Sequence, residues 1–192
     1  MAALIERVGP VRLRPRRLSP LQSLVNAVIH QQLSGQAAGT ILGRFQALFG
    51  PDGFPAPEAV LKASPDRLRS AGLSQPKACY VLGIAQQAAD GHLPTLGDCD
   101  RMTDEELVSR LTAIKGVGRW TAEMLLIFNL GRPDVLPVHD LGVRKGFRFA
   151  YGKRRLPEPE QLARYGLRWK PYRTTAAWYL WRATDFLGGG DW

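Results

Sequence analysis

Two short stretches of this 192-residue sequence hold residues whose types and spacing suggest chemistry. The first, AIKGVGRWTAEM at 113–124, sets Gly116 and Gly118 one residue apart, just before an apolar helical run. Glycine tolerates positive φ and close approach to its backbone, so the pair favours a tight turn between two helices. Backbone N–H groups at the start of the second helix would attract an anion such as phosphate. Taken alone, the pair also fits an ordinary turn between helices.

The second stretch, VLPVHDLGVRKG at 135–146, places Asp140 after Pro137 and before a helical pattern. A carboxylate at that position can cap the first turn of the next helix, where N–H groups and the helix dipole favour an anion. Capping without chemistry is the commoner role of an aspartate at a helix start. One helix and a return loop separate Trp120 from Asp140, so both can face one cleft, and this favours catalysis.

The charge of the chain favours a polyanionic partner. The net charge is +9, the pI is about 10.1, and hydrophobic residues make up an ordinary 45%. Residues 144–173, the basic stretch, carry +8 of that charge, from two acidic residues (Glu158, Glu160) and ten basic ones: Arg144, Lys145, Arg148, Lys153, Arg154, Arg155, Arg164, Arg168, Lys170 and Arg173. A smaller cluster comprises Arg12, Arg14, Arg16 and Arg17. Charge alone fits solvated basic faces equally well.

Several classes of protein are disfavoured. Cys79 and Cys99 are too few for a disulfide framework, a cysteine-ligated metal or an iron–sulfur cluster. The three histidines lack metal-ligand spacing, and no apolar run approaches a membrane span. The first residues contain no signal-peptide pattern. We therefore expect a reduced, cytoplasmic protein that needs no cofactor.

Helix signals dominate, and alternating strand patterns are nearly absent. Ser19 and Pro20 begin one helix, and Thr103 with Glu106 forms a capping box at the start of another. The expected helices span about 20–31, 34–49, 64–72, 74–90, 103–113, 119–130, 158–166 and 171–186. The sequence thus predicts an all-α protein.

Four segments together resemble the helix–hairpin–helix (HhH-GPD) DNA glycosylases, most closely the 3-methyladenine DNA glycosylase II (AlkA-type) branch. LTAIKGVGRWTAEM matches the hairpin of that family, and VLPVHDLGVRKG matches its loop with the catalytic aspartate. SLVNAVIHQQLSGQAAGTI resembles its first core helix and probe loop, and WKPYRTTAAWYLWR resembles its C-terminal helix. The matched segments reach from about residue 18 to 187. The resemblance implies two helical lobes with a DNA-binding cleft between them.

By this resemblance, Asp140 is the catalytic carboxylate. Bifunctional members carry a Schiff-base lysine two residues after the second hairpin glycine, where this chain has Trp120. Water is then the nucleophile, and strand cleavage is not expected. The resemblance implies a base pocket formed by Trp120, Tyr172, Trp169, Met124, Leu141 and Gly142, whereas Trp178 and Trp181 are expected in the core.

The resemblance also assigns the DNA contacts. Residues Lys115, Gly116, Val117, Gly118 and Arg119 would meet phosphate. The loop of Gln31, Gln32 and Leu33 would fill the gap left by the flipped base, with Gln32 or Leu33 as the wedge. The carbonyls of Thr112, Ile114 and Val117 would hold a structural Na⁺ or K⁺.

The chain departs from the AlkA-type pattern in two ways. It lacks the additional N-terminal β-rich domain, so all 192 residues are expected to form one glycosylase unit. Its first lobe would span about residues 20–132, and its second would combine about 1–19 with 133–192. His139 stands where the family often has an acidic residue, which affects the charge beside Asp140.

We therefore predict a monomeric, monofunctional DNA glycosylase that flips and releases alkylated bases of the 3-methyladenine and 7-methylguanine type during base excision repair. Its partner would be double-stranded DNA, in the cytoplasm at the nucleoid. A non-catalytic helix–hairpin–helix DNA-binding protein explains the charge and the glycines but not Asp140. A lyase-active glycosylase for oxidised bases is disfavoured by Trp120. A basic membrane-surface protein is the weakest alternative.

Overall fold

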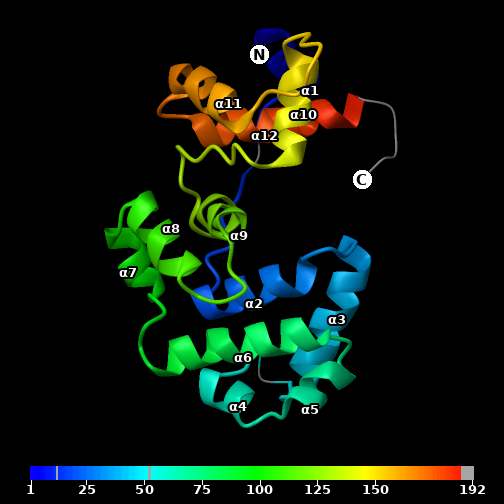
Figure 1. Ribbon diagram of the computed structural model, residues 1–192, viewed down its shortest axis with the longest axis vertical. Coiled ribbons are helices and arrows are strands. Elements are labelled where there is room, and N and C mark those ends of the chain that lie inside the picture. Colours follow the sequence, from blue (N-terminus) through cyan, green and yellow to red (C-terminus); the bar gives the residue numbers. More distant parts are fainter. Residues whose placement is uncertain (12, 52, 187–192) are drawn as a thin grey trace. The chain divides into compact units, whose positions relative to one another are not determined.

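The computed structural model describes residues 1–11, 13–51 and 53–186, and these contain helices and loops but no strand. The all-α prediction is therefore confirmed (Figure 1). Arg12, one member of the N-terminal arginine cluster, lies outside the described residues.

Contacts within the chain define two compact units. Unit 1 combines residues 1–15 with 126–192, and unit 2 spans 16–125. The sequence places the breaks near residues 19 and 132, so the two divisions differ by a few residues at each break. The cleft expected between the lobes stays a prediction.

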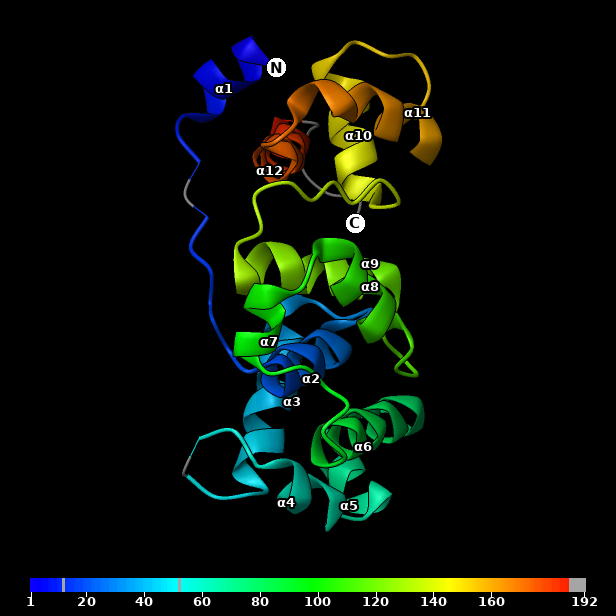
Figure 2. The ribbon, with the colours of Figure 1, turned by 90° about the vertical axis from the view of Figure 1, so that its left-hand side faces the viewer.

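Unit 2 is built around one long helix, α6 (Gln75–Ala89), which packs against α2 (Pro20–His30), α4 (Pro57–Leu61) and α5 (Pro65–Ser70). Figures 1 and 2 show α2 on one side of α6 and the short helices α4 and α5 on the other. The remaining helices of the unit are α3 (Gly35–Ala47), α7 (Leu96–Arg101), α8 (Asp104–Thr112) and α9 (Arg119–Met124). Apolar spacing explains the core, since α2 buries Leu24, Val25 and Val28 completely.

Side-chain caps set the helix starts of unit 2. The Ser19 hydroxyl accepts from the N–H of Gln22 at 3.2 Å, and Pro20 occupies the first helical position, as the sequence predicts. The capping box of Thr103 and Glu106 is also present. Thr95 forms a second box with Asp98, and its two hydrogen bonds lower the pKa of Asp98 to about 2. The short helices α4 and α7 were not among the expected ones.

Unit 1 contains α1 (Ala2–Val8), α10 (Leu141–Ala150), α11 (Pro159–Gly166), η2 (Leu167–Trp169), α12 (Arg173–Ala183) and η3 (Thr184–Phe186). It also holds η1 (Leu125–Leu130) from Leu126 onward. The helix expected at 119–130 is thus α-helical only to Met124, and π-helical after it. Helix α1 was not predicted.

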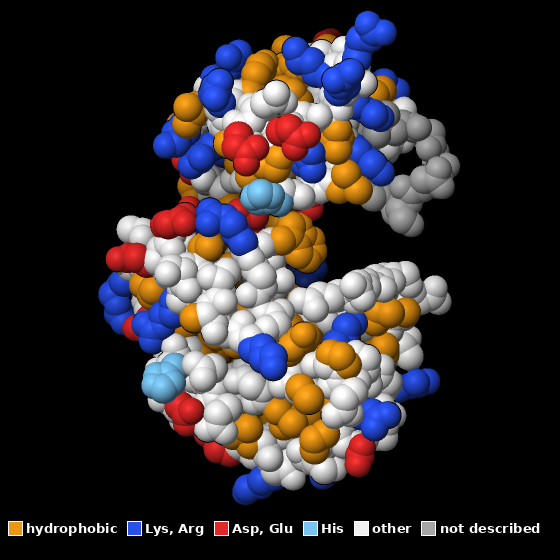
Figure 3. Space-filling model, in the orientation of Figure 1, with side chains coloured by type: hydrophobic (Ala, Val, Ile, Leu, Met, Phe, Trp, Pro, Cys, Tyr) orange, Lys and Arg blue, Asp and Glu red, His pale blue; other side chains and the backbone are white. Residues whose placement is uncertain are grey.

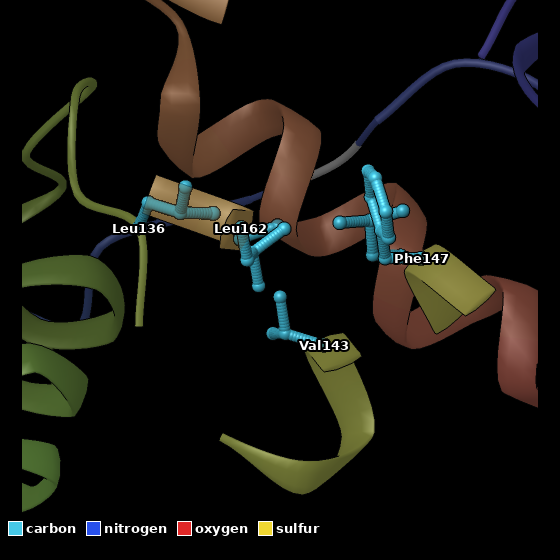
Figure 4. Packing of buried hydrophobic residues seen from close by; sticks show 6 residues of the cluster. Leu136, Val143, Phe147 and Leu162 are labelled. Atoms are coloured by element: carbon cyan, nitrogen blue, oxygen red, sulfur yellow. The ribbon is translucent and has the colours of Figure 1, made fainter. Parts of the chain in front are cut away.

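Helix α12 is the centre of unit 1, packed between α10 and α1. Leu136, Val143, Phe147 and Leu162 pack against it around Ala177 and Leu180 (Figure 4). A Cβ on Gly146 would collide with the backbone carbonyl of Leu180, so only glycine allows α10 to lie this close to α12. Because Asp140 is the N-cap of α10, this packing also fixes its position relative to α12.

The sequence predicts that the last helix begins at Pro171, but in the structure α12 begins at Arg173. Tyr172 has φ −115° and ψ 33°, outside the α-helical range. The N–H groups of Arg173 and Thr174 bond to the Asp134 carboxylate and the Pro133 carbonyl, respectively. Pro133 and Asp134, in the loop before α10, thus cap the first turn of α12 and fix where that helix starts.

Candidate DNA-binding and active-site elements

The hairpin, residues 113–118, joins α8 to α9. Its turn is closed by the Val117 N–H, which donates to the Ile114 carbonyl at 3.0 Å, and both side chains are buried. Gly116 has φ +92°, a conformation that favours glycine. Gly118 is the N-cap of α9 at φ −86°, which other residues adopt easily. The expected need for positive φ therefore holds at Gly116 alone.

The two hairpin glycines have different surroundings. A Cβ on Gly116 would run into the ring of Tyr80 on α6, whereas a Cβ on Gly118 would have no atom within 4 Å. As N-cap, Gly118 has no side chain to bond the first N–H groups of α9. Gly116 thus lets the turn pack on α6, and Gly118 places no side chain at the helix start, where anion binding stays a prediction.

The side chains around the hairpin differ in their availability. Lys115 is exposed. The Arg119 guanidinium pairs with Glu105 and with the buried Glu123, both at 3.1 Å, and Glu105 raises the pKa of Arg119. The Arg119 guanidinium is thus held by two carboxylates, and the expected contact of Arg119 with phosphate stays a prediction. Trp120 is 45% exposed, which excludes simple core packing.

The wedge loop, Gln31–Leu33, lies between α2 and α3. Gln32 has φ +58°, and Leu33 is 40% exposed at the tip. The Gln31 side-chain amide donates to the carbonyl of Gly116 at 3.3 Å, so this loop contacts the hairpin directly. Both elements belong to unit 2.

Asp140 is the N-cap of α10, as the sequence predicts. Its Oδ1 accepts from the Val143 N–H at 2.7 Å and from the indole Nε1–H of Trp181 at 2.8 Å. Two donors on one oxygen fix the direction of the carboxylate. Gly142 permits this contact, because a Cβ there would lie 2.9 Å from Trp181 Cδ1 and 3.1 Å from Asp140 Oδ1.

Trp181 packs against the hydrophobic core of unit 1, close to where the sequence predicts it, but its indole N–H also bonds to Asp140, which the sequence did not indicate. It is partly buried, and its ring is tilted by 30° against that of Phe128, with ring centroids 5.6 Å apart. An open hollow of about 400 Å³ lies beside it, lined by Phe128, Trp178, Trp181, Arg182, Thr184 and Asp185. A buried tryptophan usually needs a hydrogen-bond acceptor for its indole N–H. This requirement could have indicated from the sequence that Trp181 bonds to a polar side chain such as Asp140.

The return loop, residues 131–140, is anchored to the start of α12 by polar contacts. Arg173 forms a bidentate pair with Asp134, at 2.7 and 2.9 Å, and this pairing lowers the pKa of Asp134. The buried Thr174 hydroxyl accepts from the Val135 N–H at 2.9 Å and donates to the Arg132 carbonyl at 2.6 Å. These residues were not singled out from the sequence, because their pairing depends on contacts 39 to 42 residues apart along the chain.

The expected base-pocket residues fall in both units. Trp120 and Met124 belong to unit 2, whereas Leu141 (48% exposed) and Tyr172 (66% exposed) belong to unit 1. Their convergence on one pocket stays a prediction. Trp169 packs against Tyr165 at 5.4 Å and Phe147 at 6.2 Å between ring centroids, so it is part of an aromatic core cluster.

The basic stretch supplies much of the surface of unit 1. Figure 3 shows many Lys and Arg side chains over this unit. Some of them have structural partners: Arg173 pairs with Asp134, Arg144 lies 3.6 Å from Glu158, and Arg168 stacks on Tyr165 at 4.0 Å. The excess of basic over acidic residues in this stretch makes the surface of unit 1 positively charged, as a polyanion would require.

Two further features are absent from the described part of the chain, a metal-binding cluster and a membrane-spanning helix. No group of three or more His, Cys, Asp or Glu side chains there is arranged to hold a metal ion. None of its helices has the length and apolar character of a membrane span.

Comparison with known proteins identifies the family. The model of the HhH-GPD superfamily of base excision DNA repair proteins matches residues 25–171. The DNA-3-methyladenine glycosylase 1 of Schizosaccharomyces pombe is 38% identical over 185 residues, covering 94% of this chain and 80% of the relative. The DNA-3-methyladenine glycosylase 2 of Escherichia coli is 29% identical, covering 91% and 62%.

Solved structures agree with the sequence comparison. The S. pombe 3-methyladenine DNA glycosylase, in complex with abasic DNA, superposes with a TM-score of 0.86 at 37% identity, covering 99% of this chain and 93% of that one. A DNA-3-methyladenine glycosidase from Bacillus halodurans gives 0.87 at 38% identity, covering 97% and 84%. The hairpin and the loop carrying Asp140 both lie inside the matched region. The chain therefore belongs to the HhH-GPD superfamily of base excision DNA repair proteins.

Proposed function

We propose that this protein is a monofunctional DNA glycosylase that hydrolyses the N-glycosidic bond of alkylated bases in double-stranded DNA. The observation that carries the proposal is the Asp140 carboxylate, held on one oxygen by the N–H groups of Val143 and Trp181. A carboxylate fixed at a helix start matches the aspartate expected from the family. The names of the relatives, 3-methyladenine glycosylases, support the substrate class.

In the proposed reaction, the damaged base is first rotated out of the duplex, because its glycosidic bond lies within the stack. The bond to C1′ then breaks, and its electron pair leaves with the base. Asp140 stabilises the positive charge that develops on the sugar and orients the attacking water or accepts its proton. N-alkylation already makes the base a good leaving group, so little acid catalysis is needed.

Trp120 decides between hydrolysis and lyase chemistry. A lyase needs an amine that attacks C1′ and forms a Schiff base. An indole nitrogen is not such a nucleophile, so water takes that role here. The Trp120 side chain is 45% exposed, so its ring can stack on a flipped base, and aromatic faces attract cationic bases. Tyr172, Met124 and Leu141 are the further pocket residues in this proposal.

The DNA would be held mainly through its phosphates. In unit 2, the open helix start at Gly118 and the exposed Lys115 are the proposed phosphate contacts, while Gln32 or Leu33 fills the gap left by the base. The Ile114 carbonyl accepts one bond, from Val117, so it keeps a lone pair for a cation. With the Thr112 and Val117 carbonyls it would hold Na⁺ or K⁺ as a bridge to phosphate.

Base release from a panel of duplexes tests the proposal. Each duplex carries one lesion: 3-methyladenine, 7-methylguanine, hypoxanthine or 8-oxoguanine. We expect the cationic alkylated bases to be released, 8-oxoguanine to persist, and borohydride to trap no covalent adduct. Tight duplex binding without any base release would favour the non-catalytic alternative. The proposal further treats the protein as a monomer that acts in the cytoplasm, and sedimentation with and without DNA tests the monomer.

A further inference from the structure

A lysine of α6 holds the backbone of the wedge loop. The ammonium group of Lys77 donates to the carbonyls of Ile29 and Gln31, at 2.8 and 2.7 Å. Ile29 lies in the last turn of α2, where carbonyls lack intrahelical partners, and Gln31 is the first residue of the wedge loop. A cation is also favoured at this end of the helix.

Lys77 makes these contacts at the cost of losing part of the hydration of its ammonium group. It is half-buried, and desolvation lowers the pKa of its ammonium group. A lysine that served only solubility would extend into water and avoid this cost. The two short bonds to carbonyl oxygens compensate for the lost hydration, so the side chain has a defined position.

The same face of α6 also supports the hairpin. Tyr80, three residues after Lys77, fills the space beside Gly116, where a Cβ would collide with its ring. The Gln31 side chain then joins the wedge loop to the Gly116 carbonyl at 3.3 Å. Wedge loop, hairpin and α6 therefore contact one another in pairs within unit 2.

The tip of the wedge loop depends on fixed ends. Gln32 has φ +58°, which is unusual for a residue with a side chain, and such conformations persist only where neighbouring contacts impose them. The next residue, Leu33, is 40% exposed. With the Gln31 carbonyl held by Lys77, the strained tip is presented in one direction.

We propose that Lys77 is a positioning residue for base extrusion. It holds the wedge loop at a set position relative to the hairpin, so that the wedge enters the duplex beside the phosphate that the hairpin binds. This inference rests on the proposed function. It predicts that losing Lys77 impairs gap filling while leaving the phosphate grip of the hairpin intact.

The test uses the full chain and a duplex with a tetrahydrofuran abasic analogue opposite 2-aminopurine, which requires no chemistry. Insertion of the wedge changes the stacking, and hence the fluorescence, of the 2-aminopurine. Lys77→Met removes the donor and keeps much of the side-chain volume. We expect its preference for the abasic over an undamaged duplex to fall about tenfold, with the fluorescence change largely lost. Affinity for undamaged duplex should remain as in the wild type.

Three variants sharpen the result. Lys77→Arg, which can still donate to both carbonyls, should restore most of the preference. Lys62→Met removes an exposed lysine of unit 2 and should behave as the wild type. Should Lys77→Met fail to fold, Lys77→Gln, which is uncharged and shorter, carries the test with the same expected pattern.

Two outcomes would overturn the inference. One is a folded Lys77→Met protein with unchanged preference and fluorescence. The other is an equal loss of affinity for both duplexes, which would indicate that Lys77 binds phosphate itself. Base release by the wild type is measured separately on methylated duplex. Failure there would contradict the proposed function, whereas the abasic duplex reports on Lys77 alone.

Discussion

The hairpin and the return loop are both short connections that end at a helix start, yet they are held in place differently. In the hairpin, backbone geometry dominates: Gly116 adopts positive φ, and Gly118 supplies no side-chain cap to α9. In the return loop, side chains dominate: Arg173, Thr174 and Trp181 bond to residues of the loop. In the proposed function, the hairpin presents backbone amides to a phosphate, and the return loop presents the Asp140 carboxylate.

The difference indicates how substitutions should act. A group supplied by the backbone is altered only by adding bulk or changing φ, so glycine positions are the sensitive ones. A group supplied by a side chain is altered by replacing that side chain or its hydrogen-bond donors. Changes in the hairpin should therefore affect DNA affinity, and changes around the return loop should affect the rate of base release.

The largest effect is expected for Asp140→Asn. The amide oxygen can still accept from Val143 and Trp181, so the geometry survives while the charge is lost. Base release in single-turnover assays on methylated duplex should fall by about 10²–10⁴-fold, with affinity for DNA nearly unchanged. Release at the wild-type rate would remove Asp140 from the reaction.

Trp181→Phe isolates the indole N–H. Phenylalanine keeps an aromatic ring beside Phe128 but cannot donate to Asp140. Loss of a hydrogen bond to a charged group should slow base release by about tenfold, while the affinity for methylated duplex stays the same. Trp178→Phe is the matched control, because Trp178 lies one turn earlier on α12 and packs edge-to-face on Tyr179. Equal effects of the two substitutions would contradict the positioning role of Trp181.

The sequence predicts the local features of both regions well. Ser19, Thr103 and Asp140 cap their helices as expected, because capping depends on a few neighbouring residues. The contacts of Trp181 and Arg173 were not predicted, since they join residues about 40 positions apart. The partners of Arg119 were also missed, so the sequence alone presented it as a free cation for phosphate.

Gly118→Ala tests the contribution of the backbone in the hairpin. The new methyl group meets no protein atom within 4 Å, and φ −86° suits alanine, so the fold should be preserved. A methyl group beside the open amides should hinder phosphate and weaken binding to undamaged and lesion-bearing duplex alike, by about three- to tenfold. Gly116→Ala is a poor substitute, because it collides with Tyr80. A loss confined to lesion-bearing duplex would contradict the phosphate role.

The smallest effect concerns the ion pair of Arg173 and Asp134, which anchors the return loop. Acid can protonate Asp134 and break this pair, whereas the backbone conformation of the hairpin does not depend on a titrating group. Arg173 holds the pKa of Asp134 below its ordinary value of 3.8. The bonded carboxylate therefore stabilises the fold above pH 3.8, and this contribution is lost as the pH falls through the lowered pKa. At neutral pH, Asp134→Asn should reduce the free energy of unfolding by about 1 kcal/mol, since the pair is partly solvated. The difference between wild type and variant should shrink as the pH falls from 3.8 toward and through the lowered pKa, because the native carboxylate then becomes protonated.

Urea unfolding at several pH values measures that difference directly. Asp66→Asn is a suitable control, because Asp66 also pairs with an arginine, Arg69 at 3.1 Å, but its side chain is 88% exposed. Its effect should be near zero at every pH, as for most exposed ion pairs. An Asp134→Asn difference that stays constant from pH 7 to pH 3 would show that the anchor does not depend on charge. The return loop would then be held by the hydrogen bonds of Thr174 and by packing. Charged side chains would in that case matter less for the difference between the return loop and the hairpin.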